Sequence, residues 1–352
     1  MKPRTLYAFA AVTAAVAVAA IVAVASQPRA IGVATGGERA FPALSNALND
    51  ASEIAVKSNA AAFTIKKNGD VWVIVEKDGY PVEFDKVKSA LVKLADLRLL
   101  EAKTSDPTRY ERLQLNDVSE KEAKSKEITV KDGKGQVLAS GVLGRRNTSL
   151  FGATAAGTYM RRAGQPQTWL AEGDVDIGAT PNDWLQRRIV EIPSERVKSA
   201  EITQPTGEKL VLHKDKPEDK NYTVDNIPEG RKLAGEGEAN GIGGGLWRLE
   251  LEDVKQADKV PFDKPWVALF QTFDGITVRL ESVMVDKDVW TRVAASAEDP
   301  QGDDAAKEKL KAEAAAITER NKGWVYKMSP GDGERLTRKL DDLLEKPEAG
   351  KS

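Results

Sequence analysis

An uncharged apolar run near the N-terminus limits the structures open to this chain. The sequence carries no charged residue from Leu6 to Ser26. At about 1.5 Å of rise per residue, a helix over Leu6–Ala25 is about 30 Å long, which matches the hydrocarbon core of a bilayer. Lys2 and Arg4 precede the run, so the positive-inside bias places the N-terminus in the cytoplasm. We therefore expect a single-pass protein of the cytoplasmic (inner) membrane, with residues 27–352 on the extracytoplasmic, periplasmic side.

The same run admits two interpretations. Ala23-Val24-Ala25 resembles the small-residue cleavage site of a secretory signal peptide. The apolar part of such a peptide is usually about 7–15 residues long, shorter than this run, which favours an uncleaved signal-anchor. Residues 1–30 are then a membrane anchor with a short tether, and residues 6–25 contact membrane lipid. The sequence leaves open whether the chain is cleaved after Ala25.

The charge and the residue types present exclude several kinds of chemistry. The formal net charge is −2, so no basic surplus indicates a nucleic-acid partner. The chain has no cysteine and a single histidine, His213, which excludes thiolate catalysis and any metal site made of several histidines. We expect no metal and no cofactor, and we assign no catalytic residue.

After the tether, the sequence predicts an α+β fold of two similar modules, residues 45–193 and 195–345, each an antiparallel sheet with packed helices. Asn68-Gly69 lies between two runs of strand-forming residues and predicts a hairpin. The next apolar residues recur at helical spacing: Phe84, Val87, Leu91 and Leu94. They predict a helix over residues 84–97 that packs on the first sheet.

The order of the predicted elements suggests that the second module repeats the first. Trp72 and Tyr222 follow the first hairpin of their modules, and Trp169 and Trp324 each precede a closing helix. The two pairs have similar separations along the chain, which indicates duplication. Coincidence between aromatic residues of two β-rich domains is the alternative. The stretch Gly235–Gly245, in the place of the first module's helix, is a poor helix former because it is rich in glycine.

Several short motifs occur in the order found in one protein family. They are Asp70-Val71-Trp72-Val73, Tyr80-Pro81-Val82, Pro107-Thr108-Arg109-Tyr110, Gln167-Thr168-Trp169-Leu170 and Asp183-Trp184-Leu185. On these motifs the sequence resembles the DUF4340 family of uncharacterised bacterial proteins, over roughly residues 54–344. The resemblance implies a single-span envelope protein, since related segments occur in auxiliary subunits of ABC-type transport systems, including gliding-motility components. It implies no catalytic residue.

Three further features invite a functional interpretation, and each has a simpler structural one. His213 alternates with apolar residues on a predicted strand, which favours a polar residue at a strand end over a general base without a partner. The glycine stretch lacks the pattern of a phosphate-binding loop and predicts a surface loop. The acidic stretch Glu298–Asp304 lacks the spacing of a calcium-binding loop and predicts a loop that caps a helix.

Aromatic and basic residues supply the last candidates. Six tryptophans lie within apolar patterns and are predicted to be mostly core: Trp169, Trp184, Trp247, Trp266, Trp290 and Trp324. Arg161-Arg162 and Arg187-Arg188 are the preferred candidates for a partner contact, because arginine is enriched at interfaces.

These features favour a non-enzymatic, membrane-anchored envelope protein that works as a scaffold or auxiliary subunit of a membrane complex, such as an ABC-type transporter. Two alternatives stay open. One is a periplasmic hydrolase that acts on a glycan with two carboxylates about 5–10 Å apart. The other is a periplasmic ligand-binding module without catalysis, which would need a concave pocket lined by aromatic residues.

Overall fold

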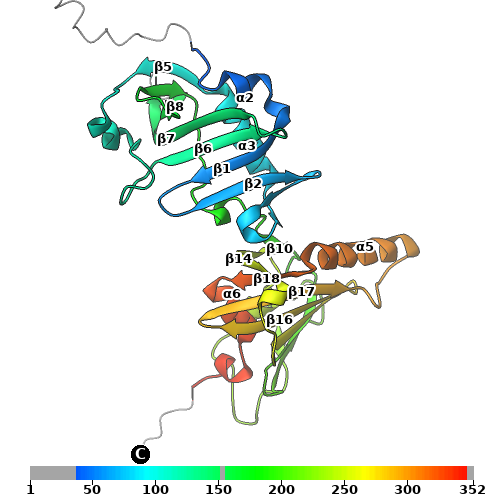
Figure 1. The fold of residues 1–352 in the computed structure, drawn as a ribbon. Coiled ribbons are helices and arrows are strands. Elements are labelled where there is room, and N and C mark those ends of the chain that lie inside the picture. The colour runs from blue at the N-terminus through cyan, green and yellow to red at the C-terminus, as the bar shows by residue number, and fades with distance from the viewer. Residues whose placement is uncertain (1–36, 151–154, 347–352) are drawn as a thin grey trace, which may run out of the picture. The chain divides into compact units, whose positions relative to one another are not determined.

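The computed structural model describes residues 37–150 and 155–346, and Figure 1 shows its fold. The predicted membrane helix over Leu6–Ala25 lies outside these residues. Within the described ranges, no helix is long and apolar enough to cross a membrane. The described chain forms two compact units. Unit 1 contains residues 37–73 and Phe84–Asp183, and unit 2 contains Ile74–Glu83 and residues 184–346.

The first of two antiparallel sheets belongs to unit 1, apart from its edge strand β4. Its strands are β1 (Ala51–Lys57), β2 (Ala62–Asn68), β3 (Val71–Ile74), β4 (Tyr80–Pro81), β5 (Arg98–Ala102), β6 (Lys126–Asp132), β7 (Val137–Leu150), β8 (Ala155–Arg162) and β9 (Thr168–Glu172). Their order in space is β4-β3-β2-β1-β6-β7-β8-β9-β5. The short helix α2 (Pro42–Asn46) precedes β1, and α3 (Phe84–Asp96) lies along one face of the sheet (Figure 1).

Two local predictions for this unit are confirmed, and one residue is corrected. The predicted β2–β3 hairpin is present, with Gly69 and Asp70 between the strands, and Asn68 is the last residue of β2. Gly69 has a positive φ of 62°, which favours glycine in such a turn. α3 buries Val87, Leu91 and Leu94 on one stripe, as its helical spacing predicted. Phe84, predicted on the same stripe, is instead 57% exposed. Phe84 is the first residue of α3, and the buried residues of this helix begin only at Val87.

Unit 2 contains the second antiparallel sheet. Its strands are β10 (Arg188–Val190), β11 (Val197–Thr203), β12 (Lys209–His213), β13 (Thr223–Val224), β14 (Leu249–Gln256), β15 (Trp266–Thr272), β16 (Thr277–Val285), β17 (Asp288–Ser296) and β18 (Trp324–Met328). Their order is β10-β14-β18-β17-β16-β15-β11-β12-β13. The helices are α4 (Asn240–Gly243), α5 (Asp304–Asn321) and α6 (Pro330–Thr337). α4 contacts β11, α5 lies along β17, and α6 contacts β15, β17 and β18.

The two sheets share one strand order. Eight strands of each sheet correspond one to one. Their spatial order is β3-β2-β1-β6-β7-β8-β9-β5 in the first sheet and β13-β12-β11-β15-β16-β17-β18-β14 in the second. Corresponding strands also follow one another in the same order along the chain. Two register shifts also match. The shift at Ala51/Glu53 in β1 matches the shift at Val197/Ser199 in β11. The shift at Leu99/Glu101 in β5 matches the shift at Leu251/Asp253 in β14. Because a bulge interrupts a ladder at one defined point, two shared bulges make the likeness specific.

The first pair of aromatic landmarks falls at matching places. Trp72 and Tyr222 are both buried. Trp72 lies in β3, two residues before its last residue Ile74, and Tyr222 lies directly before β13, two residues before its last residue Val224. The glycine-rich stretch that follows Tyr222 forms only the one-turn helix α4. Its Gly243 lies against the Tyr222 ring, where an added Cβ would be 2.2 Å from the nearest ring carbon.

The second pair of landmarks does not match. Trp169 pairs with Met160 of β8, and the corresponding residue of β17 is Thr291. Thr291 pairs with Tyr326, so Tyr326 and not Trp324 corresponds to Trp169. The predicted equivalence is wrong by two residues, because it relied on chain separation and the loops between matching strands differ in length.

Candidate functional site

The candidate site is a cleft in unit 2 with a volume of about 290 Å³. It lies between β16, β17, the last turn of α5 and the start of β18. Its charged and aromatic lining residues are Arg279, Glu281, Arg292, Lys322 and Trp324, and its small lining residues include Ala257, Val293 and Ala294. The cleft therefore combines a charged side with an apolar side.

The cleft exists because β17 and β18 stop pairing. Within the described chain these strands pair only at Trp290–Lys327 and Thr291–Tyr326. β17 continues to Ser296, so the residues after Thr291 line the cleft in place of pairing with β18. In unit 1 the matching strands β8 and β9 stay paired one position further, at Arg161–Thr168.

Two arginines hold one carboxylate at the cleft. Arg279 and Glu281 are two positions apart on β16, so their side chains lie on the same face of the sheet. Arg292 lies opposite Glu281 on β17. Arg279 donates to Glu281 Oε1 from Nε and Nη2, at 3.0 and 2.6 Å, and Arg292 donates to Oε2 from Nε. The Glu281 side chain is 14% exposed, and each arginine side chain is 48% exposed. Burial acts to raise the pKa of Glu281, but hydrogen bonds from Arg279 and Arg292 outweigh it and hold that pKa below the usual carboxyl value.

This group keeps a surplus of positive charge and of hydrogen-bond donors. Two guanidinium cations share one carboxylate, so one positive charge remains uncompensated within the group. Nη1 of Arg279 and both Nη atoms of Arg292 make no hydrogen bond to any residue in the described ranges. The Arg292 guanidinium carbon lies 4.6 Å from the centre of the Phe262 ring, which favours one orientation of its plane. The remaining donors are thus held in position.

α5 forms the wall of the cleft beside β17; it is capped at its start and bonded to β17 near its end. At its start, Asp303 accepts a hydrogen bond from the Ala306 N–H and caps the helix. Near its end, Thr318 Oγ1 accepts from Ala295 N and donates to Ala295 O, both at 2.8 Å. These bonds satisfy the backbone of β17 where its pairing with β18 has ended.

Trp324 forms the opposite wall and is supported by Tyr80, which comes from the segment Ile74–Glu83 of unit 2. The two rings meet edge to face with their centres 5.0 Å apart. The Tyr80 hydroxyl donates to the Gln186 carbonyl at 3.0 Å. Burial raises the pKa of Tyr80 to about 12 and raises that of its neighbour Tyr326. Both phenols therefore stay neutral at physiological pH and support the wall by packing.

The corresponding place in unit 1 holds apolar side chains. By strand register, Arg161 matches Arg292, and its guanidinium carbon lies 5.4 Å from the centre of the Tyr110 ring. Val142 matches Glu281. It belongs to an apolar cluster with Tyr110, Leu115, Tyr159 and Leu170. The stacked arginine is thus common to both units, whereas unit 2 has an acidic residue where unit 1 has apolar packing.

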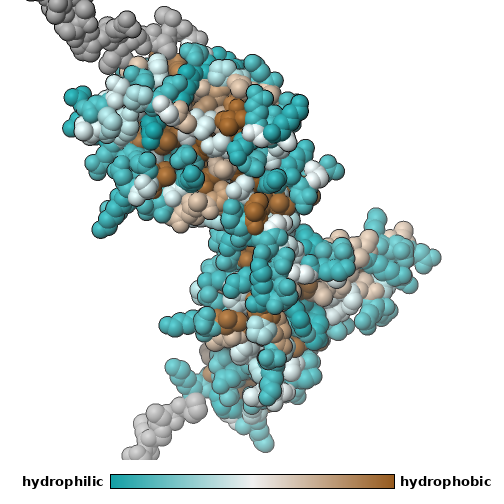
Figure 2. All heavy atoms as spheres, in the orientation of Figure 1, coloured by the Kyte–Doolittle hydropathy of each residue, from teal (hydrophilic) through white to brown (hydrophobic). Residues whose placement is uncertain are grey.

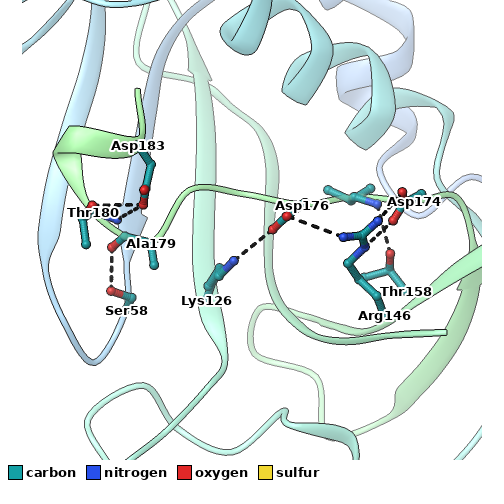
Figure 3. A network of polar contacts seen from close by, with 10 residues as sticks. Ser58, Lys126, Arg146, Thr158, Asp174, Asp176, Ala179, Thr180 and Asp183 are labelled. Carbon is teal, nitrogen blue, oxygen red and sulfur yellow. Dashed lines mark hydrogen bonds and ion pairs between the residues drawn. The ribbon is translucent and has the colours of Figure 1, made fainter. Parts of the chain in front are cut away.

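A second polar network, in unit 1, has a structural role (Figure 3). Arg146 of β7 forms ion pairs with Asp174 and Asp176, and Lys126 of β6 donates to Asp176 at 3.1 Å. Thr158 of β8 donates to the Gly173 carbonyl at 2.7 Å. Each contact joins a strand to the segment after β9, so the network fastens that segment to the sheet.

The three features considered from the sequence lie outside the cleft lining. His213 ends β12, with Nδ1 3.2 Å from Asp225 and Nε2 3.8 Å from Asp215. The acidic stretch supplies the Asp303 cap of α5, which confirms the predicted capping role. Among residues 37–150 and 155–346, no group of three or more histidine or acidic side chains is arranged to hold a metal ion.

The arginine pairs predicted for a partner contact make contacts inside their own units. Their acceptors there are the Leu115 carbonyl for Arg161, the Ala40 carbonyl for Arg162, the Leu251 carbonyl for Arg187 and the Glu191 carboxylate for Arg188. These bonds tie neighbouring elements of one unit together. A contact of these arginines with a partner stays a prediction.

The tryptophans divide by burial. Trp184 and Trp290 are buried, and Trp169, Trp266 and Trp324 are partly buried. Trp247 is 47% exposed, so its prediction as core is wrong. It follows the glycine-rich stretch, where no strand covers it. Most of the surface visible in Figure 2 is hydrophilic, with small hydrophobic areas. The other large apolar side chains exposed in the described chain are Val71, Val75, Phe84, Val92, Val137 and Met284.

The sequence-based reasoning missed the residues that build the cleft. A usable signal was present, because Arg279 and Glu281 alternate with apolar residues and Asp286-Lys287-Asp288 is typical of a turn. A tight hairpin at that turn places Glu281 opposite Arg292, as the structure shows. The end of the β17–β18 pairing had no comparable local signal.

Comparison with known proteins supplies a family but no relative of known function. A family model described as "Domain of unknown function (DUF4340)" matches residues 72–260. This match is shorter than the range of 54–344 expected from the motifs, yet it covers more than half of the chain. No curated protein and no solved structure matches the chain. The chain belongs to the DUF4340 family.

Proposed function

We propose that this protein is a non-enzymatic component of the bacterial cell envelope, a scaffold or auxiliary subunit of a membrane complex such as an ABC-type transporter. The apolar run over residues 6–25 supports a single-pass anchor in the cytoplasmic membrane. The basic residues before that run support a cytoplasmic N-terminus and periplasmic units.

The charged side of the cleft in unit 2 is the observation that carries this proposal. A guanidinium group keeps its proton at any physiological pH, so Arg279 and Arg292 cannot act as general acid or base. Their planar donors suit the binding of a carboxylate or a similar anion. A glycosidase would need two carboxylates beside its substrate, whereas Glu281 is the one carboxylate among the residues that line this cleft. The chemistry favours holding a partner's anionic group over transforming a substrate.

We further propose that the two units descend from one module by duplication. The shared strand order and the two shared bulges support this origin. In this proposal the first copy has a structural role, because apolar packing fills the place that corresponds to the cleft. The second copy has gained the binding role through the separation of β17 from β18.

The test is purification of the tagged full chain from its own membranes in mild detergent, followed by identification of co-purifying proteins. We expect recovery of at least one membrane protein in constant proportion to the chain. The double variant R279Q/R292Q should lose that partner. The variant R248Q should retain it, because Arg248 carries the same charge in the same unit and stacks on Trp247 away from the cleft. Recovery of the chain alone, under conditions that preserve known complexes, would contradict the proposal.

A further inference from the structure

We propose that the cleft of unit 2 binds a carboxylate attached to an apolar group, presented as the C-terminal residue of a partner polypeptide. This inference rests on the proposed scaffold function and adds the chemical group by which the partner is recognised.

The first step of the argument is that the cleft already contains a bound carboxylate, that of Glu281. Arg279 and Arg292 approach it from two sides and still keep three Nη atoms without a partner in the described ranges. The ion pairs with Glu281 and the Phe262 ring hold both guanidinium groups in place before any ligand arrives. A second carboxylate can therefore be bound without a large loss of side-chain entropy.

The apolar side of the cleft and its size define the rest of the ligand. Ala257, Val293 and Ala294 offer apolar surface beside the arginines, and the Trp324 ring forms a further wall. A volume of about 290 Å³ lies at the lower end of the range of small-molecule sites, about 300–1,000 Å³. Such a cleft has room for one residue entering end first. An internal acidic residue has polypeptide on both sides, and a cleft of this volume has no room for that flanking backbone.

Comparison of the two units indicates that the fold itself does not require the cleft. Unit 1 has the same strand order, yet its β8–β9 pairing continues past the matching position and Val142 replaces the carboxylate. Closing the site with apolar packing is therefore a structure that this sheet permits. The charged group of unit 2 is therefore not a requirement of this sheet, which favours a role in binding.

The experiment is isothermal titration calorimetry with the full chain in mild detergent. The probe is the tripeptide acetyl-Ala-Ala-Leu with a free C-terminal carboxylate, and the matched control ligand is its C-terminal amide. We expect the acid to bind and the amide to give no binding heat. The affinity for the acid should fall as salt is added, because the charged groups are partly exposed.

Three variants locate the site on the chain. R292Q should weaken binding of the acid by about tenfold or more, which is the size expected for one charge-assisted hydrogen bond. A294Q should also weaken it, because Ala294 is an exposed residue of the lining and a longer side chain fills the cleft without disturbing the core. R248Q should bind like the wild type. Circular dichroism on each variant checks that it is folded.

The remaining outcomes separate this inference from the proposed function. Equal binding of acid and amide, or no binding of either, overturns the inference even where a membrane partner co-purifies. Binding of N-acetyl-leucine as tightly as the tripeptide overturns the polypeptide source in favour of a small organic acid. Selective binding of the tripeptide supports the inference even where the detergent purification recovers no partner.

Discussion

Tyr222 shows how single residues set the packing of unit 2. Its ring is buried against Gly243 of α4, and Lys214 Nζ lies 4.6 Å from the ring centre. Its hydroxyl lies 2.9 Å from the Val197 carbonyl, at the start of β11. One aromatic side chain thus joins β11, the end of β12 and α4. The absence of a side chain at Gly243 makes this contact possible.

Replacing Gly243 with alanine should destabilise unit 2 because the new Cβ would overlap the Tyr222 ring. The three nearest ring atoms lie 2.2–2.7 Å from the position of that Cβ. Overpacking of this kind costs about 1–3 kcal/mol in the free energy of unfolding. Urea denaturation followed by fluorescence gives the measurement.

The matched control is Gly241→Ala in the same helix, where nothing lies within 4 Å of the added Cβ. This variant should be unchanged or more stable by up to about 1 kcal/mol, because alanine restricts the unfolded chain. Equal stability of the two variants would show that Tyr222 does not depend on the space left by Gly243.

At the scale of elements, hairpins were the most predictable part of the fold. The turn residues and the apolar alternation on each side are local, so the β2–β3 and β16–β17 hairpins and their registers follow from short stretches of sequence. The glycine-rich stretch was predicted to be a surface loop, and this is wrong in part, because Asn240–Gly243 form the short helix α4 with Ile242 and Gly243 buried. The separation of β17 from β18 was not predictable. It depends on how α5, which connects these two strands, packs against β17 through the contact of Thr318 with Ala295.

The Glu281 ion pairs should make the stability of the β16–β17 hairpin depend on pH. The arginines hold the pKa of Glu281 below its unfolded value, so the unfolded chain takes up the proton first as the pH falls. Stability from this carboxyl is therefore present at neutral pH and is lost as the pH falls into the acid range, through the lowered pKa of the folded state. The loss should be below about 1 kcal/mol, because the arginines are half exposed and solvent screens the pairs.

Urea denaturation of the wild type and of E281Q across this pH range tests the expectation. The stability difference between the two proteins should shrink as the pH falls. The control E308Q removes the same charge from the exposed face of α5 and should not reproduce this change. A difference between wild type and E281Q that is constant with pH would mean that the pairs do not stabilise the ionised carboxyl.

At the scale of the whole molecule, the division of the chain into units does not follow the sequence. The segment Ile74–Glu83 was assigned to the first module, residues 45–193, yet its contacts group it with unit 2. There Lys77 pairs with Asp253 at 2.6 Å, and Glu83 N–H donates to the Trp184 carbonyl at 2.8 Å. Local sequence patterns cannot show which unit this segment packs with, because that depends on contacts with residues more than a hundred positions away.

Tyr80→Ala should therefore weaken unit 2, although Tyr80 is encoded in the first half of the chain. Truncation of a large buried aromatic side chain costs about 3–5 kcal/mol, and Trp324 would lose its edge-to-face partner. Hydrogen exchange should show faster opening of β18 and unchanged protection of β1 and β6. Val75→Ala is the control, since Val75 lies in the same segment but is 51% exposed. Faster opening of β1 and β6, with β18 unaffected, would mean that the segment stabilises the sheet of unit 1 instead.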